Sequence, residues 1–259
     1  MYRTCFLLMA VFITSCTDRD VDTNCKTVSK PVDTYNYPVK PGDPVWTTYK
    51  NGAERLAALQ IPQEVLHTIS TEGLIQTCID YPGLGNLALN VGVHVPHALQ
   101  NMMTQFTGMI ELTKRPDSGE KMLMRYSLMD PACILNYDPN LVNIGFSLDF
   151  SAFEMMICYD EITKNMHIET KKKLIIQALD KVNKKSQHPE HYAYYSFATS
   201  LYIPTKIMLQ ERYTPFLKEV DANPELELYI QQLLWPGTHE EAEAMFTAII
   251  NHANDFIKK

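Results

Sequence analysis

Apolar residues recur at helical spacing along most of the chain that follows Trp46. The clearest case lies near the C-terminus. There Thr238 and Glu241 have the spacing of a capping box, and apolar residues then recur every three or four positions. Similar spacing predicts helices over residues 62–69, 71–79, 96–114, 117–129 and 169–185, and one that begins at Pro189 and is kinked at Pro204.

Polar residues indicate where two of the helices begin and which face of a third is exposed. Asp117 with Glu120, and Ser151 with Glu154, have the residue types and spacing of helix N-terminal caps. In the 169–185 helix the apolar residues share one face, and the lysines are expected on the other.

No stretch of the sequence alternates convincingly between apolar and polar residues. Residues 141–150 (LVNIGFSLDF) come closest to a strand and fit a loop equally well. About eight helices with short links predict an all-α fold, which is either a multi-helix orthogonal bundle or an irregular α-solenoid of antiparallel helix pairs. A solenoid requires a fixed repeat period, and no clear one is present.

The N-terminus has the three parts of a secretory signal. Arg3 precedes an apolar stretch from Cys5 to Ile13, and small residues follow before Cys16. The stretch is too short to span a bilayer as a helix. Its ending, ITSC, resembles the bacterial lipobox, with Ile13 where Leu is more usual. This resemblance implies that residues 1–15 are removed and that Cys16 carries the acyl chains that hold the protein on a membrane.

The residues after Cys16 are polar. Asp18, Asp20 and Asp22 resemble the acidic surface-export signal of Bacteroidota lipoproteins, which implies outer-membrane placement, facing the periplasm or the cell surface. From residue 17 to 45 the chain is rich in Asp, Thr, Lys and Pro, a composition typical of disordered segments. The predicted organisation is therefore a signal peptide (1–15), a lipidated Cys with a disordered tether (16–45) and a helical domain (46–259).

The net charge narrows the possible partners, and the cysteine count leaves the disulfide pairing open. With 23 Lys and Arg against 30 Asp and Glu, the net charge is −7, which argues against nucleic acid and gives no basic patch for a membrane surface. The lipid on Cys16 would provide the membrane contact. Nothing in the sequence indicates a cofactor. Four further cysteines, whose pairing the sequence leaves open, follow Cys16: Cys25, Cys78, Cys133 and Cys158.

Two groups of residues are candidate sites. His188, Glu190 and His191 could hold a metal ion if another ligand, such as His94 or His97, reached them. The tyrosine-rich stretch with Tyr192, Tyr194 and Tyr195 could line a groove for a sugar or peptide, because each ring has an apolar face and a polar tip. The purely structural alternatives are a solvated helix start for the histidines and a packed helix for the tyrosines.

The body of the chain also resembles a family. The runs WTTYKNGAERLAALQIPQEVLHTISTEGLIQTCIDYP, LQNMMTQFTGMIEL and LQERYTPFLKEV are similar to those of uncharacterised all-helical lipoproteins of Bacteroidota, a resemblance that implies no activity. No nucleophile elbow of the GxSxG type is present. We therefore expect a lipid-anchored, non-catalytic helical domain that binds an unidentified protein or envelope ligand. The alternative is a metal- or carboxylate-dependent hydrolase of glycan or peptide substrates.

Overall fold

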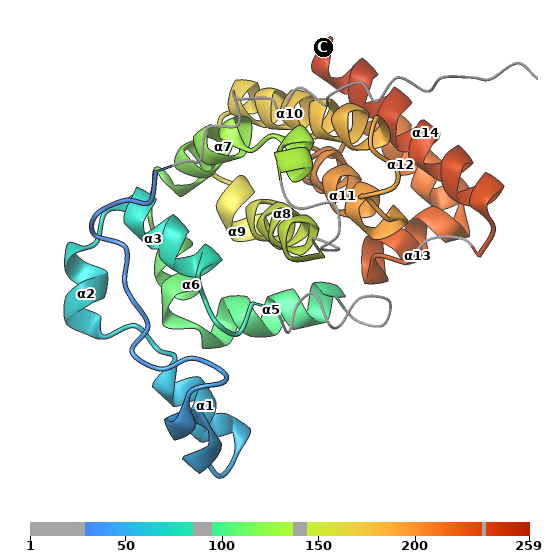
Figure 1. Cartoon of the computed structure of the whole chain (residues 1–259). Coiled ribbons are helices and arrows are strands. Elements are labelled where there is room, and N and C mark those ends of the chain that lie inside the picture. Colours follow the sequence, from blue (N-terminus) through green and yellow to red (C-terminus); the bar gives the residue numbers. More distant parts are fainter. Residues whose placement is uncertain (1–28, 85–94, 137–143, 235–236) are drawn as a thin grey trace, which may run out of the picture.

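The fold of the chain comes from a computed structural model that describes residues 29–84, 95–136, 144–234 and 237–259 (Figure 1). The N-terminal signal, Cys16 and His94 lie outside these residues. The described helices are, in chain order, η1 (Pro44–Thr48), α1 (Gly52–Ala58), α2 (Gln63–Thr68), α3 (Thr71–Ile79), α5 (Val95–Gln105), α6 (Thr107–Leu112), α7 (Ser118–Leu128), η2 (Pro131–Asn136), α8 (Ile144–Ile157), α9 (Asp160–Thr163), α10 (Ile168–Ser186), α11 (Tyr194–Gln210), α12 (Thr214–Ala222), α13 (Pro224–Gln232) and α14 (His239–Ile257).

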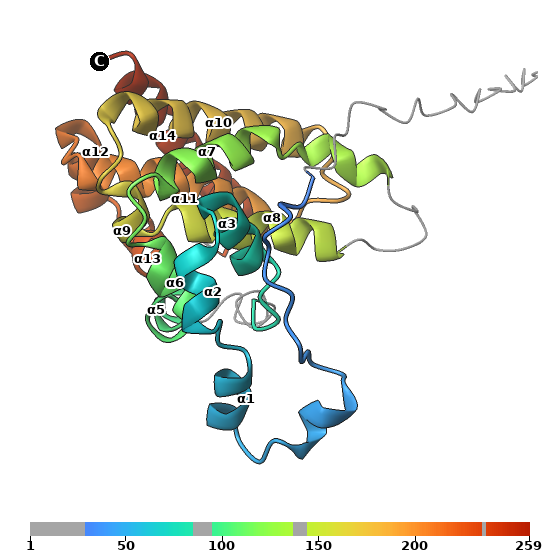
Figure 2. The same ribbon diagram turned by 90° about the vertical axis from the view of Figure 1, so that its left-hand side faces the viewer.

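Helix α11 forms the centre of a bundle. It contacts α8 and α10 most extensively, and it also packs against α9, α12, α13 and α14 (Figures 1 and 2). In a solenoid each repeat contacts only its neighbours along the chain. One helix surrounded by several others instead makes this a bundle, and the solenoid alternative is wrong. The short α1 and η1, which contain no buried residue, project away from the bundle.

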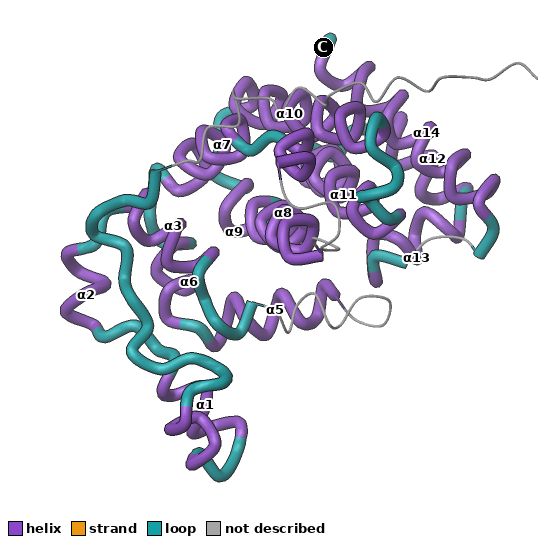
Figure 3. Tube along the Cα trace, viewed as in Figure 1, coloured by secondary structure: helices purple, strands orange, loops and turns teal. Residues whose placement is uncertain are grey.

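Among the described residues every regular element is a helix and none is a strand (Figure 3), so the predicted all-α class is confirmed. The C-terminal helix also agrees with its sequence pattern. The side chain of Thr238 accepts a hydrogen bond from the backbone N–H of Glu241 (3.3 Å), which caps α14. The buried residues of α14 follow the predicted apolar stripe: Ala242, Met245, Phe246, Ile249, Ala253 and Phe256.

The predicted helix over residues 96–114 is in fact two helices, α5 and α6. Phe106 between them has an extended backbone, with φ −93° and ψ 119°. Two hydrogen bonds from the loop between α1 and α2 stabilise this break. Gln60 Oε1 accepts one from the Thr107 N–H (2.8 Å), and Thr107 Oγ1 accepts the other from the Ile61 N–H (3.0 Å). The Phe106 ring is buried there and stacks on Tyr81. Contacts distant in sequence thus override continuous helical spacing.

The start of α8 differs from the sequence prediction. Ser151 and Glu154 lie inside this helix, which begins at Ile144, so a cap at Ser151 is wrong and most of the strand-like stretch 141–150 is helical. Helix α8 packs against α3, α7 and α11. With neighbours on several sides its core-facing surface is broad, which hides the one-sided periodicity of a surface helix.

The folded part of the chain extends farther towards the N-terminus than residue 46. Tyr37 is buried, and its hydroxyl donates a hydrogen bond to the backbone carbonyl of Thr77 in α3 (3.0 Å). The Tyr35 N–H donates to Thr77 Oγ1 (3.0 Å), and Asp33 Oδ2 accepts from the N–H of Ser70 (2.7 Å). The assignment of residues 33–37 to a disordered tether is therefore wrong, because two aromatic residues anchor this polar segment.

Helix α11 begins five residues later than predicted. Residues 189–191 form a turn, in which the His191 N–H donates to the carbonyl of His188 (3.0 Å). Tyr192 ends this loop with a buried ring, and its hydroxyl donates to the carbonyl of Pro131 in η2 (2.6 Å). Pro204 lies inside the helix, as expected.

Candidate functional site

Three lysines lie in the buried stripe of α10. Lys171, Lys181 and Lys185 are exposed by only 4%, 2% and 0%, so the expectation that the lysines share an outer face is wrong for them. The reason is spacing, because the positions 171, 174, 175, 178, 181 and 185 recur every three or four residues and form one face of the helix. The sequence contains this signal, which is a lysine in register with the apolar positions.

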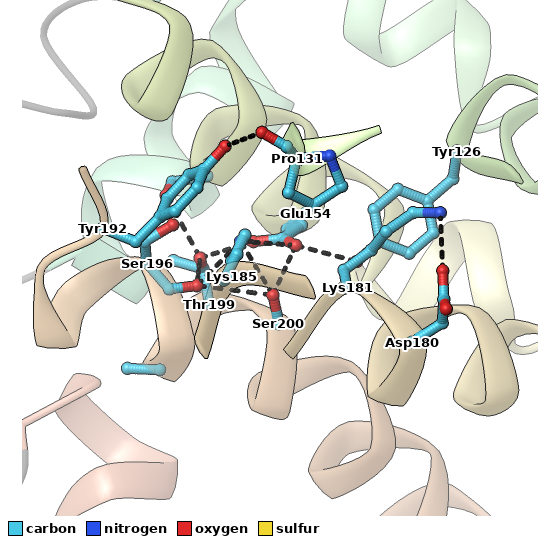
Figure 4. Close-up of polar contacts among 12 residues, drawn as sticks. Tyr126, Pro131, Glu154, Asp180, Lys181, Lys185, Tyr192, Ser196, Thr199 and Ser200 are labelled. Atoms are coloured by element: carbon cyan, nitrogen blue, oxygen red, sulfur yellow. Dashed lines mark hydrogen bonds and ion pairs between the residues drawn. The ribbon is translucent and has the colours of Figure 1, made fainter. Parts of the chain in front are cut away.

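Lys185 forms a buried ion pair with Glu154 of α8 (Figure 4). The Nζ atom lies 3.0 Å from both carboxylate oxygens, and neither side chain has any exposed surface. Nζ also donates hydrogen bonds to the carbonyl of Ser196 (2.9 Å) and to Ser200 Oγ (2.8 Å) in α11. The pair therefore joins α8, α10 and α11.

Hydroxyl groups complete the surroundings of the Glu154 carboxylate. Tyr126 of α7 and Ser200 donate to Oε1 at 2.7 and 2.6 Å, and Thr199 donates to Oε2 at 2.6 Å. We call Tyr126, Glu154, Lys185, Thr199 and Ser200 the buried polar cluster. A buried charge is tolerated only when it is paired and hydrogen-bonded, and this cluster meets both conditions.

The low dielectric of the core shifts the pKa values of Lys185 and Tyr126. Burial lowers the pKa of Lys185, although the Glu154 carboxylate opposes this effect. Burial, reinforced by Glu154, raises the pKa of Tyr126 well above its usual range. The Lys185 ammonium also lies 4.8 Å from the centre of the Phe150 ring, which gives it a cation–π contact.

The buried polar cluster resembles catalytic machinery in one respect only. A lysine within hydrogen-bonding distance of a serine can activate that serine as a nucleophile. Here, however, Lys185 is engaged by a carboxylate, and Ser200, like Thr199 and Glu154, is 0% exposed. A substrate does not reach such a serine in this structure. The cluster therefore ties four helices together in the core.

The structure does not bring Tyr192, Tyr194 and Tyr195 together into a groove. Tyr192 is buried against η2, whereas the Tyr194 hydroxyl lies 3.2 Å from Nε2 of His239 in α14. Tyr195 is partly buried against the core, and burial raises its pKa. These rings pack against different neighbours.

His188, Glu190 and His191 lie in the loop between α10 and α11. His191 Nε2 lies 3.5 Å from Glu190 Oε1. Throughout the described ranges, no group of three or more His, Cys, Asp or Glu side chains is arranged to hold a metal ion. His188, Glu190 and His191 therefore do not form such a group with one another or with any other described residue.

The cysteines of the domain differ in state. Cys78 and Cys158 are buried free thiols, and burial raises the pKa of both, which disfavours the reactive thiolate. Cys133 is disulfide-bonded. Cys25 lies outside the described residues.

A recess on the surface between α3 and α7 is a second candidate site. These helices contact each other and lie side by side in both views (Figures 1 and 2). The recess has a volume of about 170 Å³, and its lining, which we call the α3–α7 recess, consists of Ser29, Pro31, Glu72, Ile75, Gln76, Lys121, Met124, Arg125 and Leu128.

The rim of the α3–α7 recess is apolar and open to solvent. Met124 and Leu128 are 59% and 56% exposed, one turn apart on α7. Arg125 between them is half-buried, and its Nε atom is buried without a hydrogen-bond partner. No sequence signal marks this site, since Met124, Arg125 and Leu128 lie in a stretch with ordinary helical spacing.

Comparisons of the chain with protein-family models, with curated proteins and with solved structures give no match. The site geometry and the sequence are therefore the basis for any assignment of function.

Proposed function

We propose that this chain is a lipid-anchored protein of the cell envelope whose helical domain binds a partner protein or an envelope ligand without catalysing a reaction. The observation that carries the binding role is the α3–α7 recess. Two large apolar side chains, Met124 and Leu128, are more than half exposed beside a half-buried arginine. Exposed apolar groups around a concave site with a few polar groups are typical of ligand sites.

The proposed location rests on the N-terminal sequence. The apolar stretch before Cys16 and the acids after it support lipidation of Cys16 and export to the outer membrane, facing the periplasm or the cell surface. Within the described ranges, no helix is both long and apolar enough to cross a bilayer. In this proposal the acyl chains on Cys16 provide the attachment.

The non-catalytic character is supported by the burial of the reactive groups. Lys185 and Ser200 are enclosed in the core, and Cys78 and Cys158 are buried thiols. A hydrolase needs a nucleophile, an acid–base pair or metal ligands that substrate can reach. Among the described residues, the buried polar cluster and the two thiols do not provide reactive groups that a substrate can reach.

Crosslinking in intact cells tests the binding role. A photoreactive phenylalanine at Leu128 should yield a crosslinked species, because this side chain borders the recess. The matched control is the same residue at Ile176, which is also about half exposed (48%) but lies on α10. Equal crosslinking from both positions, or none from Leu128, would contradict a binding role for the recess.

Metabolic labelling with palmitate tests the anchor separately. The wild-type chain should incorporate label, and Cys16→Ala should not. Continued labelling of Cys16→Ala would contradict lipidation at this residue.

A further inference from the structure

We propose that the α3–α7 recess binds a small monocarboxylate, with its carboxylate on Arg125 and its apolar tail against Ile75, Met124 and Leu128. This inference rests on the binding role proposed above and names the class of ligand. It begins from the state of Arg125. Within the described residues no hydrogen bond or ion pair engages the guanidinium group of this arginine, and its Nε atom is buried.

The charge of Arg125 is partly removed from water and lacks a compensating partner. Burial lowers the pKa of Arg125, and the charge of the Asp80 carboxylate only partly opposes this effect. A half-buried charge without a partner loses hydration and gains no compensating hydrogen bonds. A bound anion would supply both the countercharge and the acceptors.

Apart from Arg125, the charged residues that line the recess are Lys121 and Glu72, which pair with each other. Lys121 lies 2.5 Å from Glu72, and Lys30 lies 2.6 Å from Asp80. Gln76 Nε2 also donates to Asp80 Oδ1 (2.8 Å). Among the residues that line the recess, Arg125 therefore contributes one positive charge that no lining carboxylate balances. One negative charge therefore balances the site, whereas a phosphate dianion would leave an excess beside Glu72.

The geometry of the donor favours a carboxylate. A guanidinium group offers parallel N–H donors that match the two oxygens of a carboxylate. Because Nε is the buried and unpartnered atom, the carboxylate would approach it from inside the recess rather than from bulk solvent.

The rest of the recess limits the tail of the ligand. Ile75, Met124 and Leu128, with Pro31, provide apolar surface, and the volume is about 170 Å³. An engineered apolar cavity of about 150 Å³ holds one benzene molecule. The tail is therefore a single phenyl ring or a short alkyl chain, and the flexible Met124 side chain can adapt to either.

Ligand-observed NMR with the full chain tests the proposal, with 3-phenylpropanoate as the probe and 3-phenylpropanamide as its uncharged counterpart. We expect the acid to bind at least about tenfold more tightly than the amide, and Arg125→Met to lose at least about tenfold in affinity for the acid. Arg55→Met is the matched control, because it removes the same charge on the distant α1 and should leave the affinity unchanged.

Thermal unfolding separates ligand binding from a structural role. Because Arg125 makes no hydrogen bond or ion pair with the described residues, Arg125→Met should unfold at the same or a higher temperature than wild type. A large drop in melting temperature would overturn the proposal, since Arg125 would then be a structural residue.

Three binding outcomes would also overturn it. The first is equal affinity for acid and amide, and the second is unchanged affinity in Arg125→Met. The third is binding only after Asp18, Asp20 and Asp22 are all replaced by Asn, which would identify the N-terminal acids as the occupant of the recess. If the acid fails to bind while crosslinking from Leu128 still captures a partner, the ligand class is wrong and the proposed binding role stands.

Discussion

Replacing Lys185 by methionine should strongly destabilise the protein. Lys185→Met keeps most of the apolar stem but removes the ammonium group that contacts both oxygens of Glu154 at 3.0 Å. The carboxylate would still accept hydrogen bonds from Tyr126, Thr199 and Ser200. Among the described residues, however, no positively charged group would remain hydrogen-bonded to it. The carboxylate is 0% exposed, so water does not replace the lost partner.

The expected cost follows from this burial. Breaking a buried ion pair by removing one partner costs about 3–5 kcal/mol of unfolding free energy. For a domain of this size, 1 kcal/mol corresponds to about 2–4 °C, so the melting temperature should fall by about 6–20 °C.

Urea denaturation followed by circular dichroism measures this effect. Lys173→Met is the matched control, since Lys173 is an exposed lysine of the same helix and its replacement should change stability by less than about 0.5 kcal/mol. The double variant Glu154→Leu with Lys185→Met removes both charges, and its cost should be well below the sum of the two single costs. A loss of less than about 1 kcal/mol in Lys185→Met, or additive costs in the double variant, would refute the reasoning.

Three further variants test other parts of the structure. The hydrogen bond from the Ser70 N–H lowers the pKa of Asp33, so this carboxylate stabilises the fold above its unfolded pKa and the effect is lost as pH falls through the lower folded pKa. Asp33→Asn should therefore be less stable than wild type near pH 6, and urea titrations should show the difference closing towards about pH 3; a constant difference would contradict this. Gly108→Ala should cost about 1–3 kcal/mol in denaturant titrations, because its Cβ would lie 2.6 Å from Cζ of the buried Phe106; wild-type stability would show that the ring can move. Ser196→Ala should be neutral or stabilising in thermal unfolding, because Ser196 Oγ is buried and has no hydrogen-bond partner within the described residues; a clear loss would reveal a partner.

The elements that were predicted correctly have local signals. Helix α14 carries its cap and its apolar stripe within its own sequence, so the side chains that define it are neighbours along the helix. Asp117 shows the limit of such signals. It precedes α7 as expected, but its side chain makes no cap and instead accepts a hydrogen bond from Thr71 (2.8 Å). A competing partner from another helix decided its role.

Both candidate sites depend on contacts between distant residues. Lys185 is in register with the apolar positions of α10, which marks it as unusual, but its partner Glu154 comes 31 residues earlier. Glu154 itself has the spacing of a helix cap and is found in the middle of α8. The α3–α7 recess similarly needs two helices that are far apart in sequence, so no single periodic pattern could reveal it.

The sequence by itself determined the all-α class and most helices with a one-sided apolar stripe, because helix formation depends on residues three or four positions apart. It also carries the N-terminal pattern from which the lipid anchor is proposed. Only the tertiary structure decided that α11 is surrounded, that Tyr37 ties the N-terminal segment to α3 and that Glu154 and Lys185 meet. The physical reason is that burial removes water from groups far apart in the chain, and each then requires a partner that its own local sequence does not contain.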